Sequence, residues 1–246
     1  MNRLTLSPLI RTILSWQEEA RQIPMPPSSG CKPATGGLPG PAFFPEGLGL
    51  SESAIRSKDS PTFMAIGHNF GCEDYRRELG QPGRGREDNM IGTWRSLDTL
   101  LEKAGADPNQ CYRTNWFVGL RPGSDNDGAF LLADDEAYEA SCADLLLKQI
   151  RALRPRAILL LGPVVTKRSS RISPSLDGWR FPKKKRPTFA DIDGHGHTVR
   201  GARIAHSDVT SNIVSLLHPS KGWLNQPARQ RRLGMADYEL IREALK

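Results

Sequence analysis

The chain has 246 residues, of which 34 are lysine or arginine and 27 are aspartate or glutamate, so its formal net charge is +7. This length fits one large domain or two small ones, and 38% hydrophobic with 25% charged residues is typical of a globular protein. No apolar run approaches the ~20 residues that cross a bilayer, and charges interrupt the first 20 residues too often for a secretory signal. We therefore expect a cytoplasmic protein that contacts no membrane. The excess of positive charge favours a polyanionic partner.

Cysteine and histidine spacing argues against a metal centre. No two cysteines form a C-x-x-C pair, which is atypical of disulfide-rich domains, zinc sites and iron–sulfur sites. His195 and His197 have no third ligand at metal spacing. We expect reduced cysteines and no metal or other cofactor. The four cysteines are Cys31, Cys72, Cys111 and Cys142.

The first 61 residues form a helix and an arm in this interpretation. Residues 4–22 place Ile10, Ile13 and Trp16 on one side, which predicts an amphipathic helix. Between Pro24 and Gly49, 7 of 26 residues are proline and 6 are glycine, so regular structure is not expected there. We predict a long irregular arm wrapped on the surface of the domain that follows.

Residues 62–246 alternate short apolar runs with helical patterns, and we assign them to one domain. Strands that alternate with helices predict a mostly parallel, four-stranded sheet covered on both faces, an α/β fold of three layers, α/β/α. Residues 163–212 interrupt the alternation and contain the basic run Lys183–Arg186, so we predict a long insertion or surface loop there. The predicted strands are 62–66, 111–115, 157–161 and 213–217, and the predicted helices are 93–104, 136–153 and 227–245.

Polar residues follow three of the predicted strands. Ligands of parallel sheets bind outside the carboxyl ends of the strands, so residues at these ends are expected to share one site. The strand ends read GHN at 67–69, TN at 114–115, G at 162 and HPS at 218–220.

Four motifs occur in order along these strand ends, and together they resemble the uracil-DNA glycosylase superfamily. They are GHNFG at 67–71, TNWFVGLRP at 114–122, a helix–strand block from Cys142 to Gly162, and HPS at 218–220. Each motif is weak alone, but their order on the predicted strand ends is specific. The resemblance covers about residues 62–245 without the insertion.

The resemblance implies a DNA glycosylase, which flips a nucleotide out of DNA and hydrolyses the bond between base and deoxyribose. Asn115 would read the Watson–Crick edge of the base, because its amide both donates and accepts hydrogen bonds. His218 would donate a hydrogen bond to the base O2 as negative charge develops there. Asn69 would orient the attacking water, since an amide is a poor general base. The other base-binding candidates are His68, Phe70, Gly71 and Met90.

Residues around and after the HPS motif would contact DNA. Trp223 or Leu224 is the candidate wedge, by analogy with apolar side chains that unstack base steps. The run Lys183–Arg186 either adds phosphate contacts or forms a solvated loop. We expect a monomer with DNA as its partner. The candidate DNA-binding residues are Ser220, Lys221, Trp223, Leu224 and Arg229.

The chain departs from the family pattern at Leu120, Phe70 and Met90, and a fourth residue, Gly71, bears on which base fits the site. Leu120 stands where the iron–sulfur branch carries a cysteine, so no cluster is expected. Phe70 replaces a proline of the first motif, and Met90 stands where a stacking aromatic is expected. Gly71 stands where uracil-specific members carry a tyrosine whose ring excludes a substituent at C5 of the pyrimidine.

Three functions remain open. Gly71 and Met90 leave more room in the base pocket than the two aromatic residues that other members carry there. Such a pocket suits a bulky modified cytosine, such as the glucosylated hydroxymethylcytosine that a phage-defence member of the superfamily removes from phage DNA. Other members with glycine at this position act on uracil, so repair of uracil and related deamination products is the second hypothesis. The third is a catalytically silent DNA-binding module, since Asn69 lacks the basicity of an aspartate.

Overall fold

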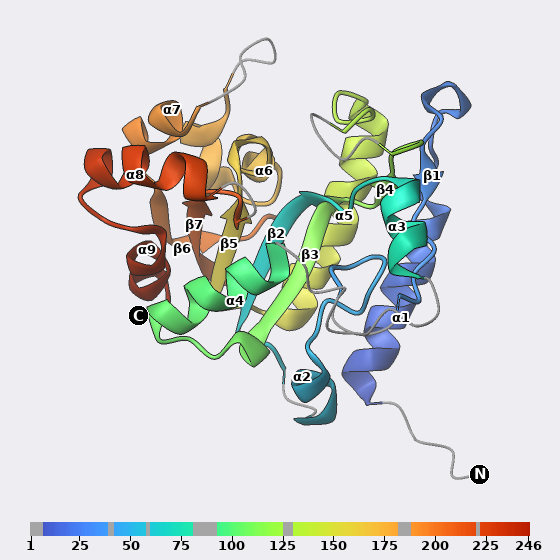
Figure 1. Ribbon diagram of the computed structural model, residues 1–246, viewed down its shortest axis with the longest axis horizontal. Helices are drawn as coiled ribbons and strands as arrows, with labels where there is room; N and C mark the ends of the chain where they lie inside the picture. Colours follow the sequence, from blue (N-terminus) through green and yellow to red (C-terminus); the bar gives the residue numbers. More distant parts are fainter. Residues whose placement is uncertain are drawn as a thin grey trace.

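The computed structural model describes residues 7–38, 42–57, 60–80, 93–124, 130–181, 188–219 and 222–246, with the backbone alone at 222–225 (Figure 1). Its first half contains α1 (Pro8–Gln22), β1 (Lys32–Pro33), α2 (Glu52–Ser57), β2 (Phe63–Asn69), α3 (Glu73–Leu79), α4 (Thr93–Ala104), β3 (Cys111–Phe117) and β4 (Gly119–Leu120). Its second half contains α5 (Glu136–Leu153), β5 (Ala157–Leu161), α6 (Pro163–Arg168), α7 (Phe189–Gly194), β6 (Thr198–Arg203), β7 (Thr210–Leu216), α8 (Gly222–Leu233) and α9 (Asp237–Ala244).

The central sheet has five strands in the order β3-β2-β5-β7-β6. The first four are parallel, and β6 pairs antiparallel with β7 at the edge. The three-layer α/β/α fold is confirmed, and the sheet has one strand more than predicted. The sequence conceals β6 because this edge strand is interrupted by a bulge and exposes Arg200, Gly201 and Arg203 instead of an apolar run. The predicted insertion at 163–212 therefore contains part of the sheet, together with α6 and α7.

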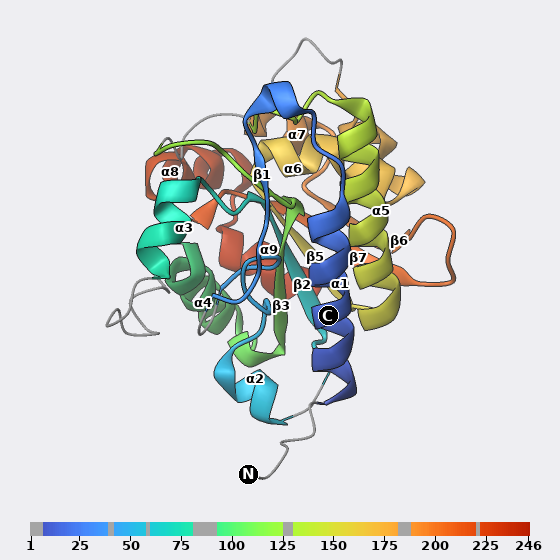
Figure 2. The same ribbon diagram turned by 90° about the vertical axis from the view of Figure 1, so that its right-hand side faces the viewer.

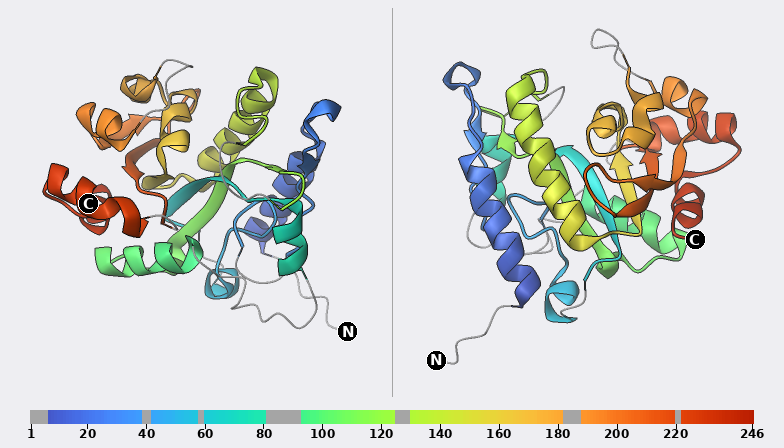
Figure 3. Two further views of the ribbon diagram at one scale, coloured as in Figure 1. Left: turned by 45° about the horizontal axis from the view of Figure 1, so that its top comes forward. Right: turned by 180° about the vertical axis from the view of Figure 1, so that it is seen from behind.

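Alternating side chains of the strands fill two cores, one on each face of the sheet. Met64 and Ile66 of β2 pack into one core, whereas Phe63 and Ala65 pack into the other. Figure 2 shows α1 and α5 on one side of the sheet and α4 on the other. Seen from behind in Figure 3, α1 and α5 lie side by side, and these two helices are in contact. Strands buried on both faces explain the uninterrupted apolar runs in the sequence.

Two predicted helices have different limits in the structure. The first begins at Pro8 rather than residue 4, because the Ser7 hydroxyl accepts a hydrogen bond from the Ile10 amide and caps it. The predicted helix 227–245 is two helices, α8 and α9, separated near Gly234, which has a φ of 69°. None of the described helices is long and apolar enough to cross a membrane.

The Pro/Gly-rich arm is not confined to the surface, because residues 42–50 run along the edge of β3. The Phe44 amide donates to the Arg113 carbonyl at 3.0 Å, and the Arg113 amide donates to the Gly49 carbonyl at 2.8 Å. The side chain of Phe44 is fully buried. The arm therefore takes the place of a further strand at this edge without forming one.

Buried polar groups fix this part of the arm. The carboxylate of Glu46 is completely buried and accepts a hydrogen bond from Arg76 Nε at 3.0 Å. Gln17 Nε2, from α1, donates to the Pro45 carbonyl at 2.8 Å and to the Gly47 carbonyl at 3.0 Å. Because these buried groups are hydrogen-bonded, the segment keeps one conformation although it has no regular secondary structure.

Candidate functional site

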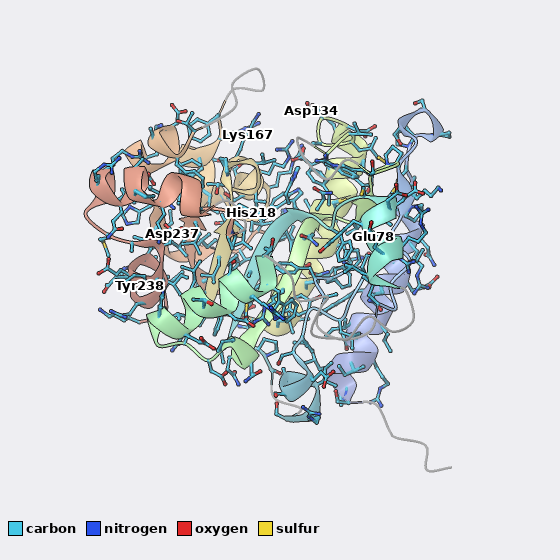
Figure 4. All side chains as sticks on the ribbon, viewed as in Figure 1. Glu78, Asp134, Lys167, His218, Asp237 and Tyr238 are labelled. Carbon is cyan, nitrogen blue, oxygen red and sulfur yellow. The ribbon has the colours of Figure 1, made fainter. Side chains whose placement is uncertain are left out.

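The carboxyl ends of the four parallel strands meet at one edge of the sheet. Gly67 of β2 pairs with Asn115 of β3, and Leu161 of β5 pairs with Leu216 of β7. A Cβ built on Gly162 would lie 3.7 Å from the Cβ of His218, which Figure 4 shows at this edge. The topology therefore brings the polar residues at 67–69, 115 and 218 to the same edge of the sheet.

Asn115 is only 5% exposed, and its amide has one fixed orientation. Its Nδ2 donates a hydrogen bond to the carbonyl oxygen of Phe44 at 3.0 Å. A carbonyl can only accept, so the amide nitrogen must face the arm and Oδ1 must lie on the other side. One N–H of the amide and the Oδ1 atom are left to recognise a ligand.

Gly67 lets the Asn115 amide lie directly on the backbone of β2. A Cβ at residue 67 would be 2.5 Å from Asn115 Oδ1, closer than real Cβ contacts occur. The amide cannot turn away without losing its hydrogen bond to Phe44. The first glycine of the GHNFG motif is therefore explained by the close approach of Asn115 rather than by a turn.

His68 presents a neutral imidazole at the end of β2. Its ring packs edge-to-face on Phe117, with 5.4 Å between ring centroids. Burial lowers the pKa of His68 to about 3, and the charges of Arg168 and Arg121 act in the same direction. The charge of His218 lowers this pKa too. In the part of the chain that the structure describes, the buried Nε2 of His68 has no hydrogen-bond partner.

Asn69 belongs to a loop that is fixed to the second motif. Its Nδ2 donates to the Gly71 carbonyl at 3.3 Å, and the same carbonyl accepts a hydrogen bond from the Arg121 amide at 3.0 Å. The Glu73 amide in turn donates to the Arg121 carbonyl at 3.0 Å. Gly71 has a φ of 136°, a conformation that is essentially restricted to glycine. The backbone alone therefore requires glycine at this position.

The structure describes the remaining predicted base- and DNA-binding residues to different extents. The ring of Phe70 packs against Tyr75, with 5.9 Å between centroids, and joins a small cluster with Leu38 and Leu79. Met90, Ser220 and Lys221 lie outside the described residues. Trp223 and Leu224 belong to the first turn of α8, where only the backbone is described.

Arg229 is buried in the structure, although the sequence predicts it as a DNA contact. Its side chain is 2% exposed and lies between two buried carboxylates. Arg229 Nη2 is 2.8 Å from Asp193 Oδ1, and its Nη1 is 3.1 Å from Asp237 Oδ1. Buried carboxylates are stable only with a hydrogen-bonded counter-ion, and this role keeps Arg229 away from the surface. The sequence does not reveal this ion pair, because Asp193 is 36 residues away from Arg229.

The same charge cluster supports the strand that leads to His218. Arg229 Nη2 donates to the Ser215 carbonyl at 2.9 Å, and Asp237 Oδ2 accepts from the Leu217 amide at 2.9 Å. Burial raises the pKa of Asp237, and the charge of Arg229 opposes this effect. The cluster therefore fixes the backbone immediately before His218 from the side away from the site.

Phe43 is a residue of this edge that sequence reasoning missed. Its Cε1 atom is 3.7 Å from a Cβ built on Gly67, and its ring packs edge-to-face on Trp94 with 5.7 Å between centroids. The only signal in the sequence is a pair of phenylalanines in a segment that is otherwise rich in proline and glycine. A prediction that places the arm on the surface gives no reason to select either ring.

The cysteines do not fit an iron–sulfur cluster, which needs several thiolates gathered around it. Cys142 and Cys111 pack in the cores on opposite faces of the sheet. Burial raises the pKa of both thiols to about 11, and at the second motif Leu120 is buried. Among the described residues, no three histidine, cysteine or acidic side chains gather as ligands of a metal ion would.

A family model described as "Uracil DNA glycosylase superfamily" matches residues 64–237, which is more than half of the chain. The matched region includes the strand ends that carry 67–69, Asn115 and His218. No curated protein matches the chain.

Replacing Gly67 with alanine should destabilise the protein, because the new Cβ would overlap with Asn115 Oδ1. Overpacking of this kind typically lowers the free energy of unfolding by about 1–3 kcal/mol. Gly178→Ala is the matched control, since a Cβ there meets nothing within 4 Å. Urea unfolding followed by circular dichroism measures both variants. Equal stability of the two variants would show that Asn115 does not press on residue 67.

Replacing Arg229 with methionine should lower the free energy of unfolding by about 3–5 kcal/mol, because it leaves buried carboxylates without their counter-ion. Arg231→Met removes an exposed charge from the same helix and should change the free energy of unfolding by no more than about 0.5 kcal/mol. Urea unfolding distinguishes the two. An Arg229→Met protein of wild-type stability with weaker, less salt-dependent DNA binding would restore the phosphate-contact interpretation.

Proposed function

The chain belongs to the uracil-DNA glycosylase superfamily, and on this basis we propose that it is a DNA glycosylase that excises a modified pyrimidine base and leaves an abasic site. Membership of this superfamily implies DNA binding. The observation that carries the proposal is the anchored amide of Asn115, at the same sheet edge as His218 and the GHN residues of the first motif. The amide offers one donor and one acceptor to a base that has been flipped out of the DNA.

The chemistry needs little more than positioned hydrogen bonds. As the bond between C1′ and the base nitrogen breaks, its electron pair leaves with the base and positive charge builds on the sugar. His218 would donate a hydrogen bond to the base O2 and stabilise the negative charge that develops there. Asn69 would orient a water molecule whose oxygen bonds to C1′, and a proton of that water ends on the departing base or in solvent. Because an amide cannot take up this proton, its contribution is orientation.

The substrate class that we propose is a cytosine with a bulky group at C5, as found in modified phage DNA, and the corresponding role is antiviral defence. Gly71 supports this substrate, because uracil-specific members of the superfamily carry at this position a tyrosine whose ring excludes a substituent at C5. Asn115 Oδ1 suits cytosine because it accepts a hydrogen bond from the exocyclic amine.

Uracil is the second candidate, because the backbone at residue 71 accounts for the glycine without a large substrate. A φ of 136° requires glycine whether or not the pocket must admit a large substituent. Asn115 Oδ1 can also accept a hydrogen bond from uracil N3–H. Substitution of Gly71 cannot separate the two substrates, because alanine and tyrosine would both strain this loop.

The test is incubation of the protein with oligonucleotides that contain uracil, unmodified bases or glucosylated hydroxymethylcytosine, followed by alkaline cleavage of abasic sites. We expect strand breaks at the modified cytosine and none in unmodified DNA. Breaks at uracil alone would establish the second candidate. DNA binding without breaks in any substrate would leave a catalytically silent DNA-binding module and contradict the proposal.

His218→Ala and Asn115→Ala should each lower the rate of base excision by about 10²–10³-fold, because each removes a hydrogen bond that is made to developing charge or to the base edge. His195→Ala is the control, since this exposed histidine directly after α7 lies outside the proposed site and its replacement should leave the rate unchanged. Single-turnover kinetics on the cleaved substrate measure all three. A folded His218→Ala protein with a near-normal rate would contradict the assigned site.

A further inference from the structure

The arm carries the aromatic ring of Phe43 close to the side-chain amide of Asn115. A Cβ placed on Gly67 would be 3.7 Å from Phe43 Cε1 and 2.5 Å from Asn115 Oδ1, so both atoms lie close to the same point. The ring of Phe43 is half-buried, so part of it remains accessible. Since Gly67 has no side chain, nothing from β2 separates the ring from the amide.

The position of the Phe43 ring is fixed from three directions. The next residue, Phe44, is hydrogen-bonded through its amide to Arg113 and through its carbonyl to Asn115. The ring itself packs edge-to-face on Trp94, at an interplanar angle of 86°. The buried side chain of Glu46 anchors the following turn through Arg76. The ring and the Asn115 amide are therefore held by one continuous segment of the arm.

We propose that Phe43 forms the aromatic wall of the base pocket and stacks on the flipped pyrimidine. This inference rests on the proposed function. Every pyrimidine has a π-face that an aromatic ring can stack on, and an N–H on its Watson–Crick edge can donate to Asn115 Oδ1 at the same time. Stacking on the plane and a hydrogen bond in the plane together select a planar base that carries a donor.

The consequence is a role for the Pro/Gly-rich arm in substrate binding. The sequence places Met90 where a stacking aromatic is expected, and Phe43 supplies an aromatic ring from a segment 47 residues earlier in the chain. The hydrogen bonds that fix the arm also orient Asn115. Loss of the Phe43 ring should therefore weaken recognition of the base and leave recognition of the DNA backbone intact.

The experiment compares the affinity of the protein for three single-stranded oligonucleotides of one sequence. Two contain 2′-fluoro-2′-deoxyuridine or 2′-fluoro-5-hydroxymethyl-2′-deoxycytidine, in which fluorine destabilises positive charge on the sugar and blocks cleavage. The third contains a tetrahydrofuran abasic analogue. The ratio of the dissociation constants for abasic and base-containing DNA measures what the base contributes to binding.

We expect Phe43→Leu to lower this ratio about 5- to 100-fold, the range that removal of a stacking ring produces. Affinity for abasic DNA should stay unchanged. Phe43→Tyr keeps the ring and should keep the ratio within about 2-fold, and Phe43→Met replaces the leucine variant if that variant does not fold. Phe181→Leu is the matched control, because it removes a half-buried ring from an edge-to-face pair with His195.

Two failures of this experiment are distinguishable. A wild-type protein that binds base-containing and abasic DNA equally would contradict base recognition, and with it the proposed function. A wild-type preference for the base that Phe43→Leu retains would overturn the stacking role of Phe43 alone. An equal loss of the preference in Phe181→Leu would overturn it too, because packing rather than stacking would then explain the effect.

Discussion

The hydrogen bond from Asn115 Nδ2 to the Phe44 carbonyl, at 3.0 Å, is the constraint on which the arrangement of the site depends. It joins a residue near the end of the edge strand β3 to an irregular segment 71 positions earlier in the chain. Because a carbonyl cannot donate, the bond determines which side of the amide faces the ligand. It also requires glycine at residue 67, and it requires the arm to be ordered, which the buried pairings of Glu46 and Gln17 achieve.

Charge supports the other side of the site. Arg229, Asp193 and Asp237 are removed from water, and such groups are stable only when each is paired and hydrogen-bonded. Their spare hydrogen bonds go to the backbone at Ser215 and Leu217, immediately before His218. Asn115 is thus oriented by a carbonyl from the arm, and the backbone that precedes His218 is held by this buried cluster. Both supports lie outside the motifs that identify the family.

Local sequence patterns predict most of the strands and the polar residues at their ends, but not the contacts between residues that are distant in the sequence. Apolar runs predict β2, β5 and β7, the segment CYRTN at 111–115 predicts β3, and the polar residues at the ends of these strands predict a site containing Asn115 and His218. The edge strand β6 has no such run, because two arginines and a glycine face solvent there. Arg229 resembles a surface cation, and only the fold reveals Asp193 beside it. Phe43 escapes prediction for the same reason. The arm pairs with β3, which is distant in the sequence, and such a pairing leaves no periodic pattern of apolar residues in the arm.

Nitrogen-15 NMR of the Asn115 side-chain amide tests the central claim most directly. In the free protein, one Nδ2 proton should exchange slowly with solvent because it is bonded to the Phe44 carbonyl, and the other should exchange faster. On addition of an uncleavable, base-containing oligonucleotide, the second proton should shift downfield, whereas abasic DNA should leave it unchanged. Equal solvent exchange of both protons, with no response to the base, would contradict an anchored amide that reads the pyrimidine.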